Sequence, residues 1–580
     1  MQKKRGLSLL LIFLALIFAF SAVSAQDETT FGGAWPYQVP PTGHLNMFAT
    51  NRIDLGIWQY LRFPPFAIYH WATGEYEGEL ADTFGYDASN NYVITLKDGI
   101  SWSDGSPLTS QDVVDTFNIR YLLNDQTWQS ISGVEAVDDL TVKFTVTAPS
   151  LDLERRILTE HVQASSVYGD IAATAAELVA AGAATGDADF DAALTELTEF
   201  RPEEEVAAGP YVLDASTITD ANIILRKNEG GYAADTVKFD TITVWNGETE
   251  QVTPLVADGS VYYATHGFPP ATEASFIDAG IDIIRGPGYS GPAIYVNHEV
   301  PPLDKVEVRQ AIAYAVDREP NGFVSLGESG VAVEYMTGIS DSLAEGWLSE
   351  ETLNSLNTYD YDPEMAASLL EGIGFTKDAD GHWLDDAGEP LAFELKFPAE
   401  FADWSAAAEN AVQQLNDFGF QITGTAVQFQ QQQQDVYDGN FQMAIRNWGS
   451  SSPFPAQSYL EPYNRYNGQG ELAGEGVGGG MHFDPNVTYS GGELNVFDAT
   501  VASGQGLDRD AQAVYVEQLA LSFNELLPAI PLWERYGNNP LHRELVDAPP
   551  SDDPSTQNPW GSVDAFIPYW IITGQLSPVA

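Results

Sequence analysis

The chain contains no cysteine among its 580 residues. This absence excludes a disulfide framework, a cysteine nucleophile, a zinc–thiolate site and an N-terminal cysteine that could carry a lipid anchor. A chain of this length also exceeds what one hydrophobic core supports. We therefore expect two or more lobes, each stabilised by apolar packing alone.

Basic residues are scarce. The 25 Lys and Arg residues stand against 83 Asp and Glu residues, which gives a formal net charge of −58. Such a field repels polyanions, so we expect no nucleic-acid partner. It does not hinder a neutral or cationic ligand, and its simplest role is to keep an exported protein in solution.

Long apolar runs are missing except near the N-terminus. Basic residues precede the run from Leu7 to Phe20, and the small-residue sequence Val23-Ser24-Ala25 follows it. This order predicts a secretory signal peptide over residues 1–25, with cleavage before Gln26, and an uncleaved anchor is the alternative. No later stretch is apolar enough to span a bilayer. The mature chain is expected to be a soluble extracytoplasmic or periplasmic protein.

Catalytic motifs are also missing. The sequence has no Gly-x-Ser-x-Gly elbow, no Gly-x-x-x-x-Gly-Lys-Ser/Thr phosphate loop and no His-Glu-x-x-His pair. The eight histidines are scattered singly. We therefore expect no enzyme, no cofactor and no metal site. A secreted glycoside hydrolase is a remote alternative, because it needs two carboxyl groups at a separation that a sequence does not give.

The spacing of apolar residues changes within the segment Tyr92–Phe117. Alternation over its first five residues predicts a strand, and the pair Asp104-Gly105 before a proline predicts a tight turn. Helical spacing follows, and Thr109 or Ser110 is well placed to cap the helix. This segment is expected to be scaffold without catalytic residues.

The motifs of the chain resemble those of the family 5 extracytoplasmic solute-binding proteins, the oligopeptide-type receptors of ABC importers. The resemblance is carried by KDGISWSDGSPLTSQDVVDTF (97–117), AGPYVL (208–213) and VRQAIAYAVDRE (308–319). It extends from about residue 45 to 545.

This resemblance implies an α/β, two-lobe periplasmic-binding-protein-like fold (type II, cluster C) with mixed sheets and a hinge. The first lobe would span residues 26–295, with an extra subdomain at roughly 60–205. The second lobe would span 296–540, and residues 541–580 would return to pack on the first lobe. A monomeric receptor of this kind closes on its ligand and presents it to the transmembrane subunits of an ABC permease.

The segment from Asn447 to Ser451 departs from the peptide-binding pattern. In similar peptide receptors, an Asp three residues after the Trp pairs with the α-ammonium of the peptide, but this chain has Ser451 there. No acid occurs between Asn447 and Leu460. A buried ammonium without a counter-ion costs several kcal/mol. The local residues therefore favour an oligosaccharide, whereas the family default is a peptide.

Nine residues are predicted to contact the ligand, because aromatic rings stack on sugar faces and polar groups bind hydroxyls. They are Trp404, Phe429, Arg446, Asn447, Trp448, Ser450, Ser451, Tyr459 and Trp533. Core packing is the competing interpretation for each tryptophan. Some relatives bind nickel, so a metal-complex receptor that uses His298 or His482 is a further alternative.

Overall fold

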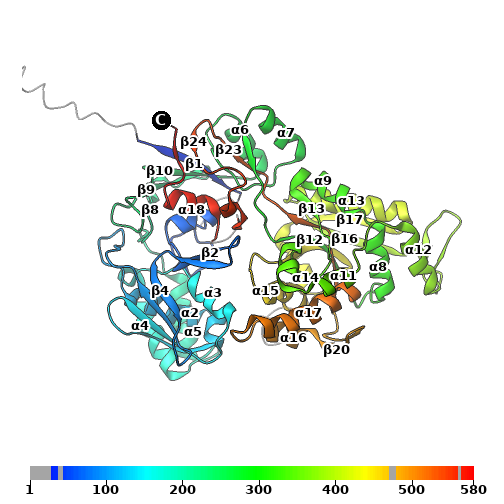
Figure 1. The fold of residues 1–580 in the computed structure, drawn as a ribbon, viewed down its shortest axis with the longest axis horizontal. Coiled ribbons are helices and arrows are strands. Elements are labelled where there is room, and N and C mark those ends of the chain that lie inside the picture. The colour runs from blue at the N-terminus through cyan, green and yellow to red at the C-terminus, as the bar shows by residue number, and fades with distance from the viewer. Residues whose placement is uncertain (1–27, 37–42, 469–478, 560–563, 580) are drawn as a thin grey trace, which may run out of the picture.

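The computed structural model of this chain describes residues 28–36, 43–468, 479–559 and 564–579. The predicted signal peptide, residues 1–25, lies outside these ranges. The described chain forms a mixed α/β molecule in which three larger sheets build two bodies side by side (Figure 1). The expected α/β fold class is confirmed.

The first sheet combines the N-terminal strand with strands from far along the chain. Its order is β1 (Thr30–Trp35), β10 (Thr241–Asn246), β9 (Asn222–Lys227) and β8 (Tyr211–Leu213), and β1 runs parallel to β10. The same core includes α18 (Phe566–Ile572), so the end of the described chain packs beside its beginning (Figure 1).

A second, antiparallel sheet has the order β4 (Ala81–Tyr86), β5 (Tyr92–Leu96), β7 (Thr141–Val146) and β6 (Ile131–Ala136). Helix α2 (Ser110–Leu122) lies in the chain between β5 and β6 and packs against α4 (Ser165–Ala181). Thr109 is the N-cap, because its backbone N–H donates to Asp112 Oδ2 at 2.8 Å in a capping box. The predicted strand, turn and helix are confirmed, and the cap is Thr109 rather than Ser110.

The third sheet carries the largest core. Its order is β17 (Gln421–Val427), β16 (Ala392–Pro398), β18 (Met443–Gly449), β12 (Ser290–Val296) and β21 (Ala529–Pro531). Strand β18 pairs with β16 in parallel and with β12 antiparallel, so it lies inside the sheet. Helices α8 (Val306–Ala315), α13 (Ala402–Phe418) and α17 (Arg509–Leu526) pack around this core.

Shorter elements complete the chain. The remaining α-helices are α3 (Leu151–Leu158), α5 (Ala188–Glu199), α6 (Thr249–Ala257), α7 (Pro270–Asp278), α9 (Arg318–Leu326), α10 (Asp341–Trp347), α11 (Glu350–Ser355), α12 (Pro363–Gly372), α14 (Phe429–Tyr437), α15 (Pro455–Leu460) and α16 (Val496–Ser503). Two-stranded pairs are β2 (Ala67–His70) with β3 (Glu75–Gly78), β11 (Asp282–Ile284) with β23 (Asn539–Leu541), β13 (Gly330–Ala332) with β22 (Trp533–Arg535), β14 (Thr376–Lys377) with β15 (Trp383–Leu384), β19 (Asn486–Tyr489) with β20 (Gly492–Asn495), and β24 (Val546–Asp547) with β25 (Ser577–Pro578).

Two adjacent segments, 285–289 and 536–538, connect the bodies. Gly288 N–H donates to Arg535 O at 2.8 Å, and Gly537 N–H donates to Gly286 O at 2.7 Å. A Cβ at Gly286 would lie 2.6 Å from Thr556 O, so only glycine fits this close approach. The first crossing therefore lies before the expected lobe boundary near residue 295, because β12 belongs to the third sheet.

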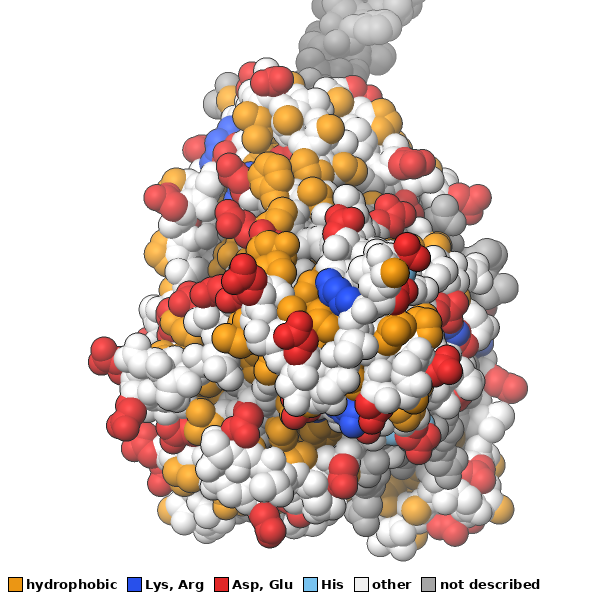
Figure 2. All heavy atoms as spheres, turned by 90° about the vertical axis from the view of Figure 1, so that its right-hand side faces the viewer, with side chains coloured by type: hydrophobic (Ala, Val, Ile, Leu, Met, Phe, Trp, Pro, Cys, Tyr) orange, Lys and Arg blue, Asp and Glu red, His pale blue; other side chains and the backbone are white. Residues whose placement is uncertain are grey.

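Acidic side chains are spread over the outer face of the second body, with few basic ones among them (Figure 2). This distribution fits the strong negative charge of the sequence. None of the described helices combines the length and the apolar character needed to cross a bilayer.

Candidate functional site

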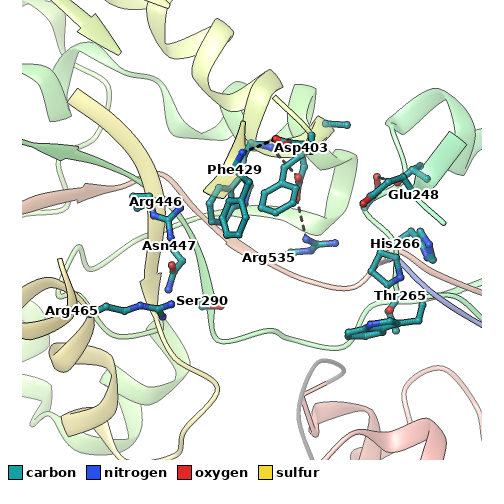
Figure 3. Close-up of a pocket in the computed structure, with 18 residues that line it drawn as sticks. Glu248, Thr265, His266, Ser290, Asp403, Phe429, Arg446, Asn447, Arg465 and Arg535 are labelled. Atoms are coloured by element: carbon teal, nitrogen blue, oxygen red, sulfur yellow. Dashed lines mark hydrogen bonds and ion pairs between the residues drawn. The ribbon is translucent and has the colours of Figure 1, made fainter. Parts of the chain in front are cut away.

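A cavity of about 390 Å³ lies between the two bodies, which places it in the size range of small-molecule sites. One wall comes from the end of β1 and from residues 248–249 and 265–267, and the other comes from the third sheet and its helices. In Figure 3, Arg446, Asn447 and Arg465 gather on one side, while Glu248, Thr265 and His266 lie on the opposite side. Arg535 lies between these groups.

Strand β18 delivers Arg446 to the cavity. Its guanidinium donates to Gln432 Oε1 at 2.8 Å and to the Tyr466 hydroxyl at 3.1 Å, and it lies over the Phe429 ring at 5.2 Å. The residue is 1% exposed, and its Nε has no hydrogen-bond partner. Among the described residues, no carboxylate forms an ion pair with it. A buried cation with neutral partners favours an anionic ligand group.

Asn447 is held in one orientation. The Tyr466 hydroxyl donates to its Oδ1, and its Nδ2 donates to Glu461 Oε2 at 3.0 Å. Arg465 pairs with the other oxygen of Glu461 at 3.1 Å and remains partly exposed toward the cavity. This network fixes the polar edge of the second wall before any ligand arrives.

The opposite wall presents hydrogen-bond acceptors. His266 forms a hydrogen bond with Gly247 O at 2.8 Å through Nε2, and burial lowers the pKa of His266 to about 4. The imidazole is therefore neutral near pH 7, with the proton on Nε2 because a carbonyl only accepts. Its Nδ1 is a bare acceptor without a partner, and Thr265 Oγ1 is likewise buried without a partner.

An ion pair and a cluster of aromatic rings also line the cavity. Arg535 pairs with Asp403, at the start of α13, at 3.2 Å. The rings of Phe401 and Trp404 meet edge to face at 5.5 Å, and Phe429 lies 4.8 Å from Phe401. The cavity thus combines charges of both signs with an apolar patch.

The structure brings four of the nine predicted residues to this cavity, namely Trp404, Phe429, Arg446 and Asn447. Ser451 lines an adjoining cavity of about 160 Å³, and its hydroxyl donates to Gly288 O at 3.0 Å. The backbone N–H of Ser450 donates to Ser458 Oγ at 3.1 Å. The two serines thus fix the loop after β18.

Three predicted residues are placed in the core instead. Trp448, Tyr459 and Trp533 are at most 1% exposed and do not line the cavity. Trp448 Nε1 donates to Trp533 O at 3.3 Å. Trp448 is covered because β18 is an interior strand of the third sheet, and Tyr459 on α15 and Trp533 on β22 are buried in the same core. The predicted stacking of these three residues on the ligand therefore finds no ring surface at this cavity.

The first wall contains residues that the sequence did not single out. Glu248, Thr265 and His266 all line it, and so does Trp35 at the end of β1. The available signal was that Glu248 follows directly after an alternating strand, where strand ends can deliver polar groups to a shared edge. His298 and His482 do not line the cavity; His298 Nε2 hydrogen-bonds with Pro528 O at 3.2 Å.

The family model for bacterial extracellular solute-binding proteins, family 5 (middle region), matches residues 75–471, which is more than half of the chain. The chain belongs to this family, as its motifs predicted.

Among curated proteins, it is similar to the glutathione-binding protein GsiB of Salmonella paratyphi A, with 25% identity over 304 residues (50% of this chain, 52% of that protein). GsiB of Pectobacterium atrosepticum is 27% identical over 315 residues (51% of this chain, 52% of that protein). The chain spans about half the length of the curated relatives it matches.

Solved structures show the same fold. The periplasmic oligopeptide-binding protein of Thermotoga maritima superposes with a TM-score of 0.75 at 21% identity, over 95% of this chain and 99% of that one. Its mannohexaose-bound form gives a TM-score of 0.72 at 21% identity, over 95% of this chain and 99% of that one. NikA from Brucella suis in complex with Fe(III)-EDTA gives 0.73 at 18% identity, over 95% and 100%. These likenesses confirm the two-lobe fold.

Proposed function

We propose that this chain is the extracytoplasmic receptor of an ABC importer, which captures a small solute between its lobes and presents it to the permease. The observation that carries this proposal is the cavity whose walls come from both bodies. A solute that contacts both walls stabilises the closed arrangement, because it binds that arrangement more tightly than the open one. The receptor works as a monomer, without a cofactor, and leaves its solute chemically unchanged.

The lobe division belongs to the same proposal. The first lobe contains the first and second sheets with the C-terminal return segment, and the second lobe contains the third sheet. Segments 285–289 and 536–538 act as the hinge, because they are the described connections between the sheets of the two lobes.

A short peptide is the first candidate solute. Arg446, Arg465 and Arg535 line the cavity together with Glu248, Glu400 and Asp403, so both charges of a zwitterion find partners there. A volume of about 390 Å³ suits a di- or tripeptide better than a long chain. Glutathione, which the curated relatives are named for, is a tripeptide with one ammonium and two carboxylates.

An oligosaccharide is the second candidate. Trp35, Phe401, Trp404 and Phe429 provide rings on both walls, and a sugar ring stacks on such faces. Mannohexaose occupies one of the structures with this fold. Burial of Trp448, Tyr459 and Trp533 removes three of the stacking surfaces that favoured a sugar.

A thermal-shift screen tests the proposal. The exported chain is heated with glutathione, with di- to pentapeptides, with α- and β-linked oligosaccharides, and with Ni²⁺. A true ligand at a hundred times its Kd stabilises the folded state by about 2.7 kcal/mol. Stabilisation by peptides supports the first candidate, and stabilisation by saccharides alone supports the second. A screen without any stabilising peptide or saccharide contradicts the proposal, and so does mass spectrometry that finds the solute cleaved.

A further inference from the structure

Two carboxylates face the cavity from different lobes. Glu248 precedes α6 on the first wall, and its side chain makes no capping hydrogen bond with that helix. Glu400 precedes α13 on the second wall, where its Oε2 accepts a hydrogen bond from Phe429 N–H at 2.9 Å. Closing the lobes therefore brings two negative groups toward the same space.

Two polar atoms on the wall that carries Glu248 lack hydrogen-bond partners. His266 and Thr265 line the same wall and are each 2% exposed, and neither His266 Nδ1 nor Thr265 Oγ1 has a hydrogen-bond partner. The bare Nδ1 of His266 can only accept, and the Thr265 hydroxyl can accept as well as donate, so a group with several N–H donors would satisfy both atoms. An ammonium group offers three donors and no acceptor.

The charge of Glu400 also acts on Glu248. Burial, and then the charge of Glu400, raise the pKa of Glu248. Like charges that approach across a cleft oppose closure, and a cation placed between them turns this repulsion into attraction.

We propose that Glu248 and Glu400 form a cation subsite that spans the two lobes and binds the ammonium group of the solute. This inference rests on the proposed function, because it takes the cavity as the solute site. In similar peptide receptors, an Asp pairs with the ammonium at the place where this chain has Ser451. The proposal assigns that task to a pair of acids on opposite lobes. The amine therefore stabilises the closed arrangement, since it contacts both lobes and removes the repulsion between their carboxylates.

Matched solutes test the subsite by calorimetric titration. Free tripeptides are compared with their N-acetylated forms, and glucosamine oligomers with N-acetylglucosamine oligomers of equal length. The free amine is expected to bind about tenfold more tightly or better in each class that binds, because a charge-assisted hydrogen bond is lost on acetylation. Glu248→Gln and Glu400→Gln should each erase this preference. Glu250→Gln, which removes an exposed carboxylate from the same helix, should preserve it.

A ligand-free measurement tests the cross-lobe repulsion itself. Small-angle scattering should report a smaller radius of gyration for Glu248→Gln than for the wild type and Glu250→Gln at low ionic strength, because the closed population rises.

Solutes that bind with equal affinity with and without the amine overturn the subsite and leave the receptor function standing. Stabilisation by Ca²⁺ or Ni²⁺ with no preference for amines also overturns it. If no peptide or saccharide binds, the proposed function fails, whereas an unchanged radius of gyration overturns the repulsion on which the subsite depends.

Discussion

Arg446 brings a positive charge into the second lobe, where Gln432, Gln433 and Tyr466 are its hydrogen-bond partners. If this cation binds the carboxylate of a solute, Arg446→Met should weaken the binding of peptides about tenfold to a hundredfold. The folded chain should keep most of its stability, because a buried charge is replaced by an apolar side chain.

The matched control is Arg309→Met. Arg309 is also buried, but it donates to the carbonyls of Leu303, Leu526 and Leu527, away from the cavity. Its loss should lower the melting temperature, because backbone carbonyls that cannot move away lose their donor, and should leave the Kd unchanged. Equal peptide affinity in Arg446→Met and the wild type, measured by titration calorimetry, would remove Arg446 from the binding site.

Glu534 gives the second prediction at this scale. Its carboxyl on β22 is 4% exposed, and burial, followed by the charge of Asp341, raises its pKa from 4.5 to about 8. Between these values the folded state holds a proton that the unfolded chain releases. The contribution of this group to stability is therefore complete below about pH 4.5 and is lost as the pH rises toward 8, by up to about 1.4 kcal/mol per pH unit.

Glu534→Gln removes this loss, because the amide stays neutral. Its melting temperature relative to the wild type should rise steadily from pH 5 to pH 8, as measured by thermal unfolding at each pH. A constant difference across this range would contradict the raised pKa.

At the scale of elements, short sequence patterns predicted those strands, turns and helices that contacts between neighbouring residues determine. The strand, turn and helix of Tyr92–Phe117 follow from periodicity and a cap, and the structure has them. Whether Trp448 is buried depends on which elements cover β18. Which residues line the first wall depends on how the two lobes meet. Neither is encoded in a short stretch of sequence, so Glu248, Thr265 and His266 were missed although Arg446 and Asn447 were predicted.

Helices α3 and α15 come from different lobes and meet at an outer contact. Gln457 Nε2 donates to Asp152 Oδ1 at 2.9 Å, and nearby Gly506 N–H donates to Pro149 O at 3.1 Å. Gln457→Ala removes one of these bonds, which is worth about 1 kcal/mol, so bound solute should dissociate about fivefold faster in stopped-flow experiments.

Gln434→Ala serves as the control, because Gln434 is an exposed residue of α14 whose Nε2 donates to Asp438, the C-cap of the same helix, at 2.9 Å. Its dissociation rate should equal that of the wild type. Equal rates in Gln457→Ala would mean that the outer contact does not hold the closed form.

At the scale of the whole molecule, solute entry should require the lobes to separate, because the cavity lies between them and the outer contact joins the same two lobes. The chain lacks cysteine, so two engineered thiols can be cross-linked without side reactions. Asp152→Cys combined with Gln457→Cys, joined by a short bis-maleimide in the absence of solute, should slow solute association at least tenfold in stopped-flow measurements. The same reagent on either single-cysteine variant should leave association unchanged.

Cross-linking after solute is bound should trap the solute against exchange with a labelled competitor, because its exit needs the same separation. Unchanged association in the cross-linked empty protein would show that solute reaches the cavity without movement of the lobes.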